Sequence, residues 1–159
     1  MRAVAPRPLQ TVLLAGLVAG ALDISAACGF HGLRGVSPVR ILQGIASGLL
    51  GSASFTGGAL TAALGFCLHF FIATVAAGVY YLISRRLTLL RSRPVVSGTV
   101  YGVAVYLFMQ NVVLPLSAVT RRPFSLSTAL VMVVIHIVCV GLPIAFIVSR
   151  HSRRTGAAA

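Results

Sequence analysis

Five strongly polar side chains lie deep inside long apolar stretches of this 159-residue sequence: Asp23, His69, Gln110, Asn111 and His136. Asp23 is the only acidic residue in the chain. An aspartate at the centre of a membrane helix costs about 2.5–3.5 kcal/mol on insertion scales, so such residues commonly mark proton or ion sites. A structural role, in which the side chains hydrogen-bond across helices and fix their register, is the alternative.

The apolar stretches around these residues are long enough to cross a bilayer, which takes about 20 residues. We predict spans at residues 9–28, 57–84, 95–118 and 125–149. The remaining segments are an N-terminus at 1–8, a connector at 29–56, loops at 85–94 and 119–124, and a tail at 150–159. The predicted fold class is therefore an all-α, integral membrane four-helix bundle.

The connector contains one further helix, which we predict over residues 38–51. Ser37 and Pro38 are typical of the cap and first residue of a helix. Ile41, Ile45 and Leu49 then recur at helical spacing. About 14 residues are too few to span, so this helix is either interfacial or re-entrant.

The charge of the chain is +12, and all 13 basic residues are arginines between or beyond the apolar stretches. Nine of them lie in the termini and the 85–94 loop, and four lie in the other two loops. The positive-inside rule then predicts cytoplasmic termini and an outward-facing connector, in a bacterial inner membrane. Because no basic stripe carries interleaved aromatic residues, we expect anionic lipid headgroups as partners and no nucleic acid.

Four of the five polar residues are predicted to lie at similar depth. Counted from the cytoplasmic end of each span, Asp23, His69, Gln110 and His136 lie roughly 20–22 Å into the helix. Asn111 is the neighbour of Gln110. Each of the four also shares a helix face with mostly small or polar residues, so we expect them to point into the bundle as one layer.

Glycines on these faces favour close helix packing, since small residues let membrane helices approach. The predicted spans contain two GxxxG pairs, one in the first span and one in the third. The predicted helix-packing residues are Gly16, Gly20, Gly65, Gly98 and Gly102.

Three functional hypotheses follow from this pattern. The first is a small transporter or channel-like protein, or a subunit of one, with a proton or cation site at Asp23 and helix breaks at Pro115 and Pro143. The second is a non-catalytic partner in assembly, either with another membrane protein or as a homo-oligomer. The third is a membrane cytochrome in which His69 and His136 ligate haem.

Enzymatic activity is not expected. The sequence has no paired carboxylates, no H-E-x-x-H, no G-x-S-x-G and no P-loop. Its three cysteines, Cys28, Cys67 and Cys139, form no C-x-x-C pair. We therefore predict no catalytic residues and no metal site, and no cofactor apart from the haem alternative.

The second span carries a resemblance to a known class of proteins. Its residues 58–82 read GALTAALGFCLHFFIATVAAGVYYL, with glycine, histidine and alanine on one helical face. This pattern resembles small four-span bacterial inner-membrane proteins of uncharacterised function. The resemblance implies a four-helix membrane fold and no particular activity.

Overall fold

Four long apolar helices form the body of the protein. The computed structural model describes residues 8–120 and 125–156, which fold into helices with no strand among them. The helices long and apolar enough to cross a membrane are Pro8–Gly32, Gly58–Arg86, Pro94–Leu116 and Leu126–His151. The predicted all-α bundle is confirmed, and its four spans are those of a multi-pass membrane protein. Parts of the predicted N-terminus, outer loop and tail, at 1–7, 121–124 and 157–159, lie outside the described residues.

The first two spans are single helices, α1 (Pro8–Gly32) and α3 (Gly58–Arg86). The third consists of α5 (Pro94–Phe108), η2 (Met109–Val113) and α6 (Leu114–Leu116). The fourth consists of α7 (Leu126–Ile135), η3 (His136–Gly141) and α8 (Leu142–Gly156). Two helices are longer than predicted: α1 continues past residue 28 to Gly32, and α8 continues past residue 149 to Gly156, so most of the predicted tail is helical.

The segments η2 and η3 are π-helical, and each ends two residues before a proline. Within them the backbone bonds reach five residues back, from Leu114 to Met109 and from Leu142 to Ile137. A proline has no N–H, and its ring clashes with the carbonyl four residues earlier. A widened turn ahead of Pro115 and of Pro143 relieves that clash and keeps the helix continuous.

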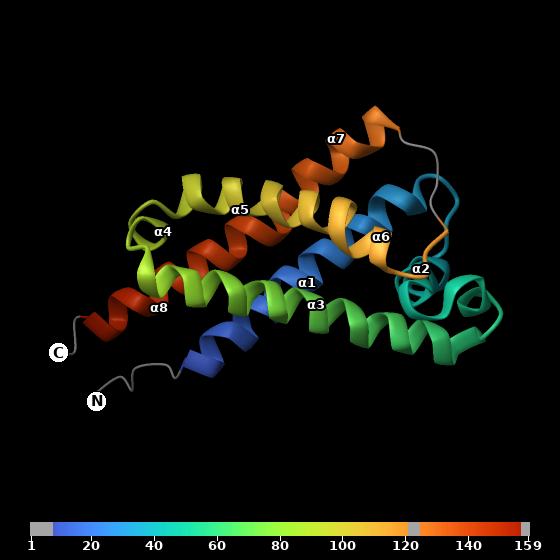
Figure 1. The fold of residues 1–159 in the computed structure, drawn as a ribbon, viewed down its shortest axis with the longest axis horizontal. Coiled ribbons are helices and arrows are strands. Elements are labelled where there is room, and N and C mark those ends of the chain that lie inside the picture. Colours follow the sequence, from blue (N-terminus) through green and yellow to red (C-terminus); the bar gives the residue numbers. More distant parts are fainter. Residues whose placement is uncertain (1–7, 121–124, 157–159) are drawn as a thin grey trace.

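The short helix α2 (Pro38–Leu50) caps one end of the bundle. The Ser37 side chain accepts a hydrogen bond from Arg40 N, and Pro38 is the first helical residue, as predicted. Gly51, whose φ of 59° suits glycine, ends the helix. Figure 1 shows α2 at one end, and α4 (Leu89–Ser92), the start of α1 and the end of α8 at the other. A 3-10 turn, η1 (Gly51–Phe55), joins α2 to α3.

The buried core is near the α4 end, where all four spans meet. It is built of small residues on α1 and α3, such as Ala15, Ala19 and Ala77, against Ile144 and Val148 of α8. Toward the α2 end the packing opens: α7 leans away from α6 in Figure 1, and none of its residues is buried.

Candidate intramembrane polar site

Glycines bring α1 and α3 into close contact below the polar residues. A Cβ added to Gly16 would lie 2.6 Å from Thr74 Cα, and one added to Gly20 would lie 2.9 Å from the Phe70 ring. Gly65, on the same side of α3, faces the backbone of α2, where a Cβ would collide with the Leu42 carbonyl oxygen.

A second glycine contact joins α5 to η3. A Cβ on Gly102 would lie 2.6 Å from Ile137 Cα, and one on Gly98 would lie 2.9 Å from the Gly141 carbonyl oxygen. Gly141 is itself buried and has no room for a Cβ against the backbone of Gly98 and Gly102. No sequence pattern distinguishes Gly141, because the helix face on which it lies depends on the π turn of η3.

His69 links α3 to the backbone of α1. Its Nε2 lies 2.8 Å from the Gly20 carbonyl oxygen. A carbonyl oxygen only accepts, so Nε2 carries the proton and donates. The absence of a side chain at Gly20 lets the ring approach this carbonyl. If His69 were to ligate haem through Nε2, this bond would have to break.

Asp23 lies one turn beyond the core residue Ala19 and faces η3. Its side chain is half-buried and lies on the side of α1 that approaches Cys139 of η3. No hydrogen bond or ion pair joins the Asp23 side chain to any residue within the described ranges. Cys139 is thus a neighbour of the site, a role that the sequence pattern does not predict for it.

The helix backbone near Cys139 lacks one hydrogen-bond donor. In an unbroken α-helix the Cys139 carbonyl would accept from the N–H of residue 143, which is a proline and has none. The π turn of η3 also shifts the neighbouring bonds by one residue. The Asp23 carboxylate therefore faces a stretch of helix in which the usual donor to a carbonyl oxygen is absent.

His136 begins η3 and faces α5. Its Nδ1 lies 2.8 Å from the Met132 carbonyl oxygen, and its ring packs edge-on against Tyr106 at a centroid distance of 5.4 Å. The His136 ring is half-buried and its bond to Met132 stays within its own span.

Gln110 and Asn111 are exposed, in contrast to the inward direction expected for them. Asn111 donates to the Leu107 carbonyl oxygen of its own helix at 2.8 Å. In an unbroken α-helix Gln110 would share a face with Tyr106, which lies four residues earlier. The π turn of η2 rotates the residues after Phe108, so Tyr106 is buried whereas Gln110 faces outward.

The five predicted polar residues therefore do not form one hydrogen-bonded cluster in the part of the chain that the structure describes. Asp23 lies beside η3, His69 reaches the same helix, α1, one turn away at Gly20, and His136 begins η3. Over residues 8–120 and 125–156, no group of three or more histidine, cysteine or acidic side chains could hold a metal ion.

Comparison with known proteins adds no further assignment. No protein-family model, no curated protein and no solved structure matches this chain. The sequence and structure by themselves support the identification of a small, all-helical, multi-pass membrane protein whose only acidic side chain lies within its first span.

Proposed function

We propose that this protein binds a proton or a small cation at Asp23, as a small transporter or channel-like protein or as a subunit of one. The observation that carries the proposal is the lack of a hydrogen bond or ion pair to Asp23 from any described residue. A carboxylate that served only to join helices would be expected to have such a partner.

The energetics of the bilayer support a bound ion. An unpaired carboxylate in apolar surroundings is unfavourable by about 2.5–3.5 kcal/mol on insertion scales. Low dielectric favours the neutral acid, whereas a nearby cation favours the carboxylate. Asp23 is the only acidic residue, and the arginines of the described spans, Arg85, Arg86 and Arg150, lie at the ends of their helices. A proton or an external cation is therefore expected to compensate the charge of Asp23.

The irregular backbone of η3 supports the same proposal. Transporters commonly bind their coupling ions where a membrane helix is interrupted and its carbonyls become available. Pro143 has no N–H to donate within the turn that follows Cys139. A carbonyl oxygen of η3 freed in this way would provide a second oxygen for a cation, or an acceptor for a protonated Asp23 carboxyl.

A flux assay tests the proposal. The purified chain is reconstituted in liposomes, and proton, sodium and potassium fluxes are each followed with a suitable dye. We expect flux of one of these ions, and we expect Asp23→Asn to abolish it. Ser25→Ala is the matched control, because Ser25 is exposed on the same helix and bonds only to Ala21 of that helix.

The proposal fails if Asp23→Asn and Ser25→Ala both retain the wild-type flux. It also fails if wild-type liposomes are no more permeable to any of these ions than protein-free liposomes, provided that the protein is shown to be inserted and helical.

For the cellular location, we propose a bacterial inner membrane with both termini in the cytoplasm. The larger number of arginines in the termini and the 85–94 loop supports this orientation. In Figure 1 the start of α1, the end of α8 and α4 lie at the same end of the bundle, as an even number of spans requires. Reporter fusions at the C-terminus and at residue 52 test it, with cytoplasmic and external signals expected respectively.

A second candidate is assembly with another membrane protein or a second copy. Its support is Gln110, an exposed amide within a membrane span. An amide facing lipid lacks hydrogen-bond partners, so its exposure favours a polar group on a neighbouring helix. Gln110→Leu is expected to shift a multimer or complex toward the monomer in mild detergent, whereas Asn111→Leu, which removes a bond internal to its helix, is not.

A further inference from the structure

A groove opens between α1 and α3 at the end of the bundle that carries α4. It has a volume of about 340 Å³ and is lined on one side by the first turns of α1 and on the other by the last turns of α3. Gly78 forms part of its floor and leaves space that a side chain would fill. The nearest side-chain atom to a Cβ built there would be Val12 Cγ1, at 3.7 Å.

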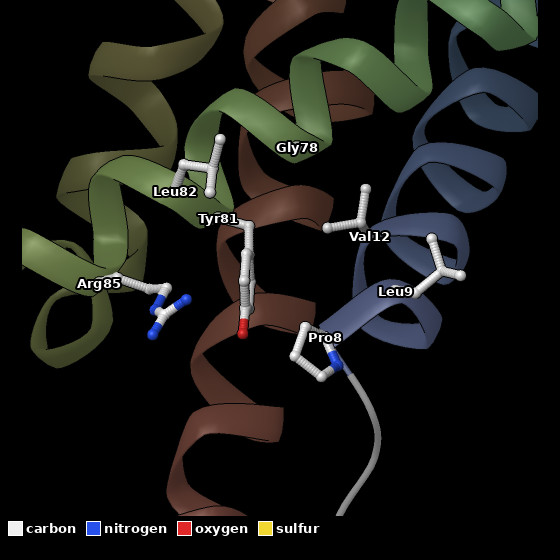
Figure 2. Close-up of a pocket in the computed structure, with 7 residues that line it drawn as sticks. All are labelled: Pro8, Leu9, Val12, Gly78, Tyr81, Leu82 and Arg85. Carbon is white, nitrogen blue, oxygen red and sulfur yellow. The ribbon is translucent and has the colours of Figure 1, made fainter.

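The groove is apolar along its length and polar at its mouth. Val12 and Leu82 line the inner part, whereas the Tyr81 hydroxyl and the Arg85 guanidinium lie at the other end, beside Pro8 (Figure 2). Pro8 and Arg86 are the limits of their spans, so this mouth lies at the boundary between lipid and water.

Both polar groups at the mouth are available to a ligand. Neither the Tyr81 hydroxyl nor the Arg85 guanidinium makes a hydrogen bond, ion pair or ring contact with another residue in the described ranges. Arg86, Arg91 and Arg93 add positive charge at the same end, and the only acidic residue, Asp23, lies farther along α1. This end of the protein is therefore complementary to a negative group.

We propose that the groove binds one anionic phospholipid. Arg85 and Tyr81 donate hydrogen bonds to its phosphate, and an acyl chain lies along Val12, Gly78 and Leu82. A phosphate ester attached to a hydrocarbon chain is the one membrane component that matches a basic mouth and an apolar groove together, and basic pockets between membrane helices commonly bind such lipids. The proposal does not depend on ion binding at Asp23.

Native mass spectrometry of the whole chain in detergent tests this proposal. Phosphatidylglycerol and phosphatidylcholine with the same acyl chains are added at equal concentration, and the bound fraction of each is measured. We expect one phosphatidylglycerol to be retained in preference to phosphatidylcholine. Arg85→Ala is expected to weaken retention about tenfold, since a hydrogen bond between charged groups contributes about that factor. Gly78→Leu, which fills the groove, is expected to abolish the preferential retention of phosphatidylglycerol.

Arg86→Ala is the matched control, because it removes the same charge from the next residue, which does not line the groove. The proposal is overturned if Arg86→Ala weakens binding as much as Arg85→Ala, or if both lipids are retained equally. Displacement of the lipid by millimolar inorganic phosphate would also overturn it, because the phosphate alone would then account for binding. Circular dichroism of each variant checks that the helices remain. If Gly78→Leu does not fold, the comparison of Arg85→Ala with Arg86→Ala still decides the question, because both residues are exposed.

Discussion

The imidazole Nε2 of His69 lies 2.8 Å from the backbone carbonyl oxygen of Gly20, and this bond joins the second span to the first. The acceptor is a carbonyl within a helix, exposed because Gly20 has no side chain to cover it. A polar residue predicted to belong to a functional layer is thus also part of the helix packing. Gly20 lies three residues before Asp23 on α1, so we expect a change at His69 to alter the packing of the helix that carries the proposed ion site.

Replacing His69 with leucine is expected to lower the free energy of unfolding by about 0.6–1.7 kcal/mol, the range measured for hydrogen bonds between membrane helices. His69→Gln, which keeps an N–H donor, should recover part of the loss. Unfolding in mixed micelles measures both variants. A leucine variant as stable as the wild type would show that the bond to Gly20 contributes nothing to stability.

A tyrosine pair near the α4 end provides a second test of the packing. Tyr101 donates its hydroxyl to the Ala76 carbonyl oxygen at 2.7 Å, and its ring meets Tyr80 edge-on at 4.9 Å. Tyr101→Phe should lower the free energy of unfolding by about 1 kcal/mol, because Ala76 loses a donor in a buried site. Tyr81→Phe is the control, since no described residue bonds to its hydroxyl. If the two variants are equally stable, the hydrogen bond from Tyr101 to the Ala76 carbonyl oxygen does not stabilise the protein.

The contact between α5 and η3 should tolerate no side chain at Gly102. Gly102→Ala places a Cβ against the Ile137 backbone and is expected to destabilise the protein by about 1–3 kcal/mol, as overpacking does. Gly29→Ala is the control, because a Cβ there meets no atom within 4 Å. Thermal unfolding followed by circular dichroism compares them. If the two alanine variants have the same melting temperature, the distance between α5 and η3 must be larger than in the structure.

Pro143 should matter to ion flux and not only to helix shape. Pro143→Ala restores an N–H that can bond to a carbonyl of η3, so one oxygen beside Asp23 becomes occupied. We expect flux in liposomes to fall by roughly fivefold, the factor for a net hydrogen bond of about 1 kcal/mol. Pro115→Ala, which alters the other π segment away from Asp23, should leave flux near the wild-type value. A similar fall in both variants would argue against a role for the η3 carbonyls.

The sequence predicts the elements well because the signals that define them are local. Four apolar stretches, the Ser37–Pro38 start of α2 and the small-residue face of α3 each depend on a few neighbouring residues. On α3 the predicted face of Ala62, Gly65, Ala73 and Ala77 is buried, with His69 half-buried among them.

The composition of the site is harder to predict, since it depends on two π turns. The π-helical hydrogen bonds after Phe108 rotate Gln110 away from the face of Tyr106. Pro115 is the only residue in this stretch that indicates such a change. The partner of His69 is a backbone oxygen, which has no sequence signature. Cys139 and Gly141 are placed by the same π turn, in η3, and the chain gives no local signal for either role.

The most direct test of an ion site at Asp23 uses the fact that it is the only side-chain carboxyl in the protein. Infrared difference spectra of the reconstituted protein, recorded as pH or the concentration of sodium or potassium is changed, report on this group. Asp23→Asn removes its signal and leaves that of the C-terminal carboxylate. We predict a carboxyl band that changes with protonation or with one of these cations and that is absent in Asp23→Asn. A spectrum in which no band assignable to Asp23 responds to pH, sodium or potassium would contradict the account.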